Sequence, residues 1–182
     1  MYCGPRLVCA VALALCALFS SLASAQTPGY KEYNAFAYFY EQTEGCDLFE
    51  TYLDVFERWT PLESGLTEHS TTLKIDSLHY DTCEETYVSV VRGSMLIPDN
   101  AFRTQGLKTA SVQTALSFTD SWTGEIVPVI LDLRWTCDRA RIDRAKPAST
   151  CAPLTLSGSV LVGSRDLMDL SSRQGELILW KY

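Results

Sequence analysis

An alternation of apolar and polar side chains runs through almost the whole chain and restricts the fold more than any other feature. It is clearest over residues 109–119 and 125–136, where one set of alternate positions is almost entirely apolar. Successive side chains of a β-strand point to opposite faces, so a period of two predicts strands with one buried and one solvated face. Six further segments follow the same pattern: 35–41, 46–58, 71–81, 86–95, 154–162 and 176–182.

These segments predict an all-β domain of about eight strands, because they are short and regularly spaced and no helical period accompanies them beyond a turn near residues 166–170. Sandwiches and barrels both have this pattern. A small-ligand barrel of the lipocalin type would normally carry a G-x-W motif near its first strand, and the sequence has none. We therefore expect a single two-sheet β-sandwich of antiparallel strands.

The first 25 residues have the organisation of a secretory signal peptide. Arg6 supplies the positive charge, residues 7–22 are almost wholly apolar, and Ala23-Ser24-Ala25 provides the small residues for cleavage after Ala25. The apolar run is shorter than the roughly 20 residues that a membrane-spanning helix needs. We expect a signal peptide over 1–25 and a mature domain over 26–182 that is secreted, periplasmic or held at the cell surface, with no membrane span.

Four of the seven cysteines lie in the expected mature domain: Cys46, Cys83, Cys137 and Cys151. An even number in an oxidising compartment predicts two disulfides. If segments 46–58 and 71–81 form an antiparallel hairpin, Cys46 lies beside Cys83. The second bridge, Cys137–Cys151, then closes the loop between two later strands. No C-x-x-C spacing is present, so a zinc site is not expected.

Composition and charge describe a folded acidic protein. Hydrophobic residues make up 47% and charged residues 20% of the 182-residue chain, a balance typical of a globular domain. The formal net charge is −7. Nucleic acids and anionic membranes bind chiefly through cationic surfaces, so neither is an expected partner.

Two groups of side chains are candidates for ligand binding. Tyr38 and Tyr40, extended by Tyr30 and Tyr33, form an aromatic stripe that could stack on sugar rings, and Tyr52 is a further candidate. Aromatic residues at a period of two are also common where a sheet packs. Arg139 and Arg141 belong to a basic cluster inside the expected Cys137–Cys151 loop and could contact an anion or an acidic glycan. The alternative for these arginines is a solvated loop whose charge is offset by neighbouring aspartates.

The sequence offers little that is typical of catalysis, since no G-x-S-x-G nucleophile motif is present. Glu50, Asp54 and Asp132 are the carboxylates that a small hydrolase of the glycosidase kind would use. A strand face kept polar for solubility explains them more simply. The acidic turn 81–85 lacks the alternating aspartates and the glycine of a calcium loop. No catalytic residue, metal or cofactor is predicted.

Several short motifs resemble those of a group of small secreted bacterial proteins of unknown function. They are Ala37-Tyr38-Phe39-Tyr40 followed by Gly45-Cys46, the turn Tyr80-Asp81-Thr82-Cys83, the segment 131–136, and the strand 110–118 with its turn 120–124. Such proteins tend to have a glycine-rich stretch after the Trp-Thr pair, whereas this chain has the charged segment 137–144. The resemblance implies a secreted β domain and brings no activity or binding residues with it.

The compartment, the fold class and the aromatic content together predict an exported, non-catalytic β domain. We expect it to bind an extracellular carbohydrate or another exported macromolecule, or to serve as a surface component. The alternative is a small secreted hydrolase that uses the strand carboxylates.

Overall fold

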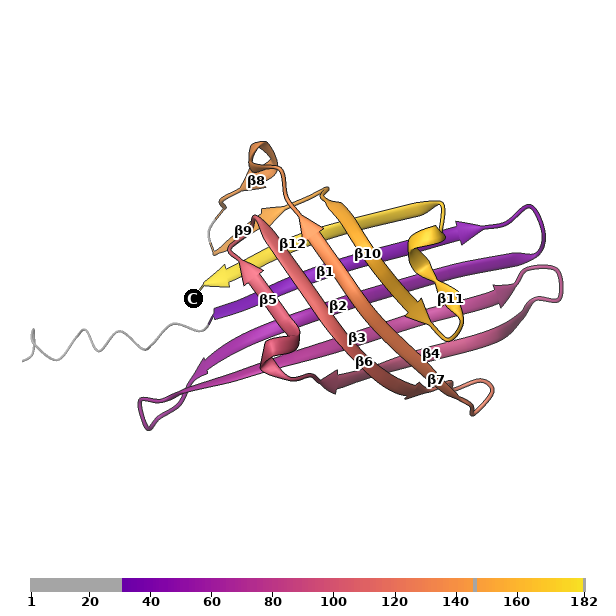
Figure 1. Ribbon diagram of the computed structural model, residues 1–182, viewed down its shortest axis with the longest axis horizontal. Helices are drawn as coiled ribbons and strands as arrows, with labels where there is room; N and C mark the ends of the chain where they lie inside the picture. Colours follow the sequence, from indigo (N-terminus) through magenta and orange to yellow (C-terminus); the bar gives the residue numbers. More distant parts are fainter. Residues whose placement is uncertain (1–30, 146, 182) are drawn as a thin grey trace, which may run out of the picture.

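Two antiparallel β-sheets packed against each other form the structure, a computed structural model that describes residues 31–145 and 147–181. Figure 1 shows the strands of the smaller sheet crossing obliquely in front of those of the larger one. The all-β prediction and the sandwich-like arrangement are confirmed. The expected signal peptide, 1–25, lies outside the described residues. Within them, no helix is long and apolar enough to cross a bilayer.

The larger sheet has seven strands and the smaller sheet has five. The seven are, in spatial order, β4 (Thr86–Leu96), β3 (Thr67–Asp81), β2 (Asp47–Pro61), β1 (Lys31–Gln42), β12 (Ser172–Lys181), β9 (Ala148–Cys151) and β8 (Ile142–Asp143). The five are β11 (Arg165–Asp166), β10 (Thr155–Val162), β7 (Ile126–Thr136), β6 (Thr109–Thr119) and β5 (Phe102–Gln105). Three 3₁₀ turns complete the elements: η1 (Asp99–Ala101), η2 (Arg139–Arg141) and η3 (Leu167–Asp169).

The expected number of about eight strands is wrong, because the described chain forms twelve. The eight alternating segments correspond to the eight long strands. The other four, β5, β8, β9 and β11, have only two to four residues each. A strand of that length is too short to show an alternation, so its pairing depends on the neighbouring long strand and leaves no pattern in the sequence.

The core lies between the sheets, and at its centre small residues of β1 accompany a large residue of β7. Ala35 and Ala37 of β1 are fully buried, as is Trp135 of β7. The indole Nε1 of Trp135 donates a hydrogen bond across the core to the backbone carbonyl of Phe36, at 2.7 Å. The alanines leave room for the indole, and its N–H finds the partner that a buried donor requires.

Both predicted disulfides are present. Cys46 and Cys83 join the turn after β1 to the turn after β3, with their Cα atoms 5.3 Å apart, and the register that places Asp47 opposite Asp81 explains their proximity. Cys137 and Cys151 link the end of β7 to β9, with a Cα–Cα distance of 6.2 Å, and so tie the two sheets to each other. Two disulfides fit an oxidising setting such as the periplasm or the extracellular space.

At one corner, β4 is also joined to the turn between β6 and β7. Val91 forms an isolated bridge with Asp120, and the N–H of Ser121 donates to the carbonyl of Val90 at 2.8 Å. The buried carboxylate of Asp120 accepts the hydroxyl of Ser89 at 2.5 Å. It also accepts three backbone N–H groups, those of Val90, Trp122 and Thr123.

Candidate functional site

Tyr38, Tyr40 and Tyr52 lie together on the outer face of the seven-stranded sheet, the side turned away from the viewer in Figure 1. The extension of the stripe to Tyr33 is wrong, because that residue points into the core and is 2% exposed, and Tyr30 lies outside the described residues. Tyr38 of β1 and Tyr52 of β2 are directly opposite in register, and their ring centroids are 4.7 Å apart. Tyr38 and Tyr40 stack at 6.4 Å with 21° between their planes. Tyr52 is 41% exposed. We call these three residues the tyrosine platform.

Glu50 fixes the platform from one side. Its Oε1 accepts the hydroxyl of Tyr38 at 3.0 Å and that of Tyr52 at 2.8 Å. The pKa of Tyr38 is raised mainly by burial and secondly by its hydrogen bond to Glu50. The pKa of Tyr52 is raised mainly by its own hydrogen bond to Glu50. Both phenols are therefore neutral donors, and the two rings are held before any ligand arrives.

The platform belongs to a longer row of outward side chains that crosses five neighbouring strands. In register order the row is Gln174, Tyr38, Tyr52, Asp76 and Arg92. Arg92 holds Asp76 through two hydrogen bonds, from Nε at 2.9 Å and from Nη2 at 3.1 Å. At about 4.8 Å per strand, the row extends roughly 19 Å across the sheet. Amide, aromatic, carboxylate and guanidinium groups thus follow one another in a line.

The two arginines proposed as ligand contacts lie elsewhere. Arg139 and Arg141 are exposed residues of η2, in the loop closed by the Cys137–Cys151 disulfide. Arg141 donates through Nη1 to the carbonyl of Pro153 at 3.3 Å. The turn η2 directly precedes β8, the edge strand, and both β9 and β12 separate β8 from β1. The predicted binding residues therefore lie at two separate places on the molecule, the tyrosine platform and the loop that contains η2.

The three candidate carboxylates do not form a pair. Glu50 and Asp54 share the outer face of β2 but are four residues apart, which sets their Cα atoms roughly 13 Å from each other. Asp132 is exposed on the other sheet, on β7. Burial raises the pKa of Asp54, and a hydrogen bond from Asn34 and the charge of Lys74 oppose that rise.

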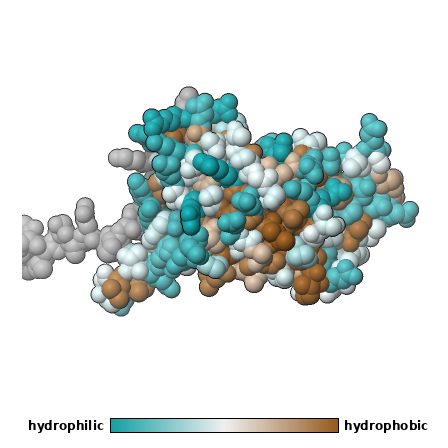
Figure 2. Space-filling model, in the orientation of Figure 1, coloured by the Kyte–Doolittle hydropathy of each residue, from teal (hydrophilic) through white to brown (hydrophobic). Residues whose placement is uncertain are grey.

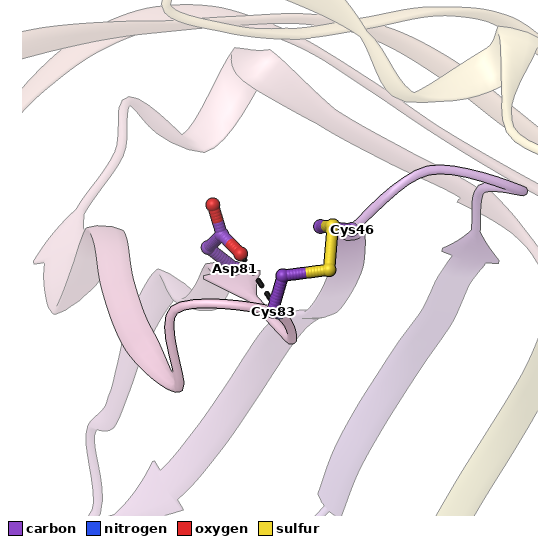
Figure 3. Close-up of side chains that lie close together, drawn as sticks. All are labelled: Cys46, Asp81 and Cys83. Atoms are coloured by element: carbon purple, nitrogen blue, oxygen red, sulfur yellow. Dashed lines mark hydrogen bonds between the residues drawn. A yellow bond between two sulfur atoms is a disulfide. The ribbon is translucent and has the colours of Figure 1, made fainter.

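The acidic turn after β3 has a structural explanation. Figure 3 shows Asp81 beside the Cys46–Cys83 disulfide, and these three residues have ligand-type atoms within 4.8 Å of one another. The two sulfurs are bonded to each other and cannot act as thiolate ligands. Oδ1 of Asp81 accepts the backbone N–H groups of Cys83 and Glu84, both at 2.9 Å. The carboxylate therefore holds the turn that positions the disulfide.

A cleft between the sheets is the feature that reasoning from the sequence missed. It has a volume of about 360 Å³ and opens where β2, β3 and β4 face the ends of β7 and β10. Its lining includes Phe49, Thr51, Ser77, His79, Ser89, Val127, Val162, Arg165 and Leu167. The guanidinium carbon of Arg165 lies 3.3 Å from the centroid of the Phe49 ring, and His79 stacks on the same ring at 4.2 Å. We call this the inter-sheet cleft.

Comparison with known proteins gives little guidance. No known family model matches the chain, and no curated protein matches it. A crystal structure of a Nitrosomonas europaea protein provisionally called AttH is similar over 88% of this chain and 53% of that chain, with a TM-score of 0.37 and 9% sequence identity. The present chain thus spans about half the length of that protein. A likeness this distant says nothing about function.

Proposed function

We propose that the protein is an exported, non-catalytic binding domain whose tyrosine platform takes up an extracellular carbohydrate. The observation that supports this most is the row across the outer face, in which the rings of Tyr38 and Tyr52 are flanked by hydrogen-bonding side chains on both sides. An exposed row of this kind across five strands suits an extended ligand. Another exported macromolecule with such a face is the second ligand class that the row would accommodate.

Carbohydrates match this chemistry because a sugar ring has apolar C–H faces and a polar rim. Tyrosine rings bury the apolar face of the sugar. Carboxylate and guanidinium groups form hydrogen bonds with its hydroxyls, and these bonds are stronger than those between two neutral groups because one partner is charged. Glu50 and the Arg92–Asp76 pair supply such groups beside the platform. Because Glu50 already restrains two of the rings, binding would cost less side-chain entropy than it would on a mobile surface.

The same geometry favours binding over hydrolysis. A glycosidase holds two carboxyl groups between about 5 and 10 Å apart across the scissile bond. Oε1 of Glu50 is engaged by the hydroxyls of Tyr38 and Tyr52, and Tyr52 stands between Glu50 and Asp54 on the strand. Asp132 belongs to the other sheet and cannot complete the pair.

The test compares two tyrosines with nearly equal exposure on the same sheet. Tyr52 is 41% exposed within the platform, and Tyr87 is 42% exposed on β4, where it contacts Tyr80 and Trp122 instead. Oxidised mature protein would be screened against a panel of soluble and insoluble polysaccharides. Affinity for the best ligand would then be measured by calorimetry. We expect Tyr52→Ala to weaken binding at least about tenfold, because central aromatic residues dominate such interfaces, and Tyr87→Ala to leave it unchanged.

Two results would contradict the proposal. One is a polysaccharide that binds Tyr52→Ala and the parent protein equally well. The other is a panel in which nothing binds, which would leave a surface component that acts without a carbohydrate ligand.

A further inference from the structure

The inter-sheet cleft has two chemically different walls. The wall from the seven-stranded sheet carries the polar side chains of Thr51, Ser77 and His79 beside Phe49 and Leu78. The opposite wall has an aliphatic part, formed by Val127, Val162 and Leu167, with Ser164 and Arg165 next to it. The hydroxyls of Thr51 and Ser77 lie 2.7 Å apart and share one hydrogen bond. A cavity of about 360 Å³ falls in the size range of small-molecule sites. An occupant with one polar end and one apolar body would match both walls.

Arg165 is the residue best placed to meet the polar end. It reaches from β11, on the smaller sheet, to the ring of Phe49 on the larger one, with its guanidinium carbon 3.3 Å from the ring centroid. Its closest acidic contact is a loose one, with Nη1 3.8 Å from Oε2 of Glu41. Within the described part of the chain the guanidinium makes no hydrogen bond, and the side chain is 41% exposed. A guanidinium that stacks by its face keeps the N–H groups of its edge available for a carboxylate.

The surroundings of Arg165 select among anions. His79 stacks on Phe49 and binds Asp47 through Nε2 at 2.7 Å, so the imidazole is held by a carboxylate of the chain itself. Glu41 contacts Arg165 and Asp47 contacts His79, and Asp166 and Asp169 line an adjoining hollow together with Arg165, so several negative charges surround this side of the cleft. They would repel a phosphate or another dianion much more than a group with a single charge.

We propose that the inter-sheet cleft binds a small monocarboxylate with an apolar body. The carboxylate accepts hydrogen bonds from the guanidinium edge of Arg165, and the body lies along the aliphatic wall of Val127, Val162 and Leu167. This site is separate from the tyrosine platform, since the platform side chains point out of the opposite face of the same sheet.

The probes are octanoate and 3-phenylpropionate, with octanamide as the uncharged analogue of the first. Binding to oxidised protein would be followed by calorimetry and by two-dimensional amide NMR. We expect saturable one-to-one binding of at least one acid, with shifts concentrated at Thr51, Ser77 and Val162. Octanamide should bind at least about tenfold more weakly than octanoate, because a hydrogen-bonded charge pair is lost.

Variants of Arg165 test the assignment. Arg165→Gln should reduce affinity for the acid at least about tenfold, while Arg165→Lys, which keeps the charge and loses the planar fork, should lose less. Arg103→Gln, at an exposed position of β5, is the matched control and should bind as the parent does. Circular dichroism would confirm that each variant is folded. If Arg165→Gln did not fold, the test would rest on Arg165→Lys.

Any of the following outcomes would overturn the proposal. The first is that neither acid binds saturably. The second is that octanamide binds as tightly as octanoate, or that every folded variant of Arg165 binds as the parent does. The third is that the shifts appear at Tyr38 and Tyr52, which would move the ligand to the platform.

Discussion

Replacing Asp120 with asparagine would test how the two sheets are joined at the β4 corner. Asp120 is only 2% exposed. Burial alone would raise its pKa, but the hydrogen bonds from Ser89 and from three backbone N–H groups outweigh that effect and lower the pKa from 3.8 to about 2. The carboxylate is thus held in its charged form by the folded structure and by little in the unfolded chain.

The size and the direction of the effect follow from that pKa. Each tenfold change in proton affinity is worth about 1.4 kcal/mol, so the lowered pKa corresponds to roughly 2 kcal/mol of stability. Because the pKa is depressed on folding, this contribution is fully present well above pH 4 and is lost as the pH falls through about 2. Asparagine keeps the shape, but its amide nitrogen cannot accept the bonds that Oδ2 accepts. We expect Asp120→Asn to lose roughly 2 kcal/mol at pH 7.

The assay is urea unfolding, followed by tryptophan fluorescence, of the parent and Asp120→Asn at pH 7, 5, 3 and 2. The difference in unfolding free energy should be constant at pH 7 and 5 and should shrink towards pH 2. Asp132→Asn, at an exposed position of β7, should show little difference at any pH. A difference for Asp120→Asn that stays the same from pH 7 to pH 2 would refute the argument, since it would mean that the charge does not stabilise the corner.

Two further predictions concern the disulfides and Gly158, a glycine of β10 that packs closely on the backbone of β7. In the chain-entropy relation, removing Cys46–Cys83, with a separation of 37 residues, should cost about 4 kcal/mol, and removing Cys137–Cys151, with a separation of 14, about 3 kcal/mol. Urea unfolding of the two double serine variants would measure both, and a larger loss for the shorter loop would contradict the relation here. Gly158→Ala should lose at least about 2 kcal/mol, because its Cβ would lie 1.9 Å from a carbonyl oxygen of β7 at a φ of +108°. The control is Gly45→Ala, whose Cβ would meet only one side-chain oxygen at 3.5 Å, and its unfolding free energy should stay within about 0.5 kcal/mol of the parent's. Equal losses of unfolding free energy for the two variants would show that the crowding at Gly158 relaxes freely.

The parts of the fold that the sequence predicted are those that depend on local pattern. The eight long strands could be identified because their alternation extends over at least eight residues, and one hairpin pairing was enough to bring Cys46 to Cys83. The four short strands could not, since two to four residues carry no period. The contact of Trp135 with the carbonyl of Phe36 also has no local signal, because the two residues are 99 positions apart.

The same distinction between local and long-range contacts separates the two candidate sites. The tyrosines of the platform could be named as candidates from the sequence, although their juxtaposition was not predicted. Tyr38 and Tyr52 belong to consecutive strands joined by a short turn, so a hairpin brings them together. The inter-sheet cleft could not, because Phe49 and Arg165 come from strands of different sheets and no spacing in the sequence relates them. Contacts between layers require the packing of the sheets, which an alternation pattern leaves open.

Both sites nevertheless depend on one short stretch of β2. Phe49 and Thr51 point inward to the cleft, while Glu50 and Tyr52 point outward to the platform. A slip of one residue in the pairing of β2 would exchange these two sets and destroy both surfaces at once. The Cys46–Cys83 disulfide adjoins the first residue pair of β2 and β3 and opposes such a slip. The disulfide therefore does more than add stability, because it fixes which side chains of β2 face the cleft and which face the solvent.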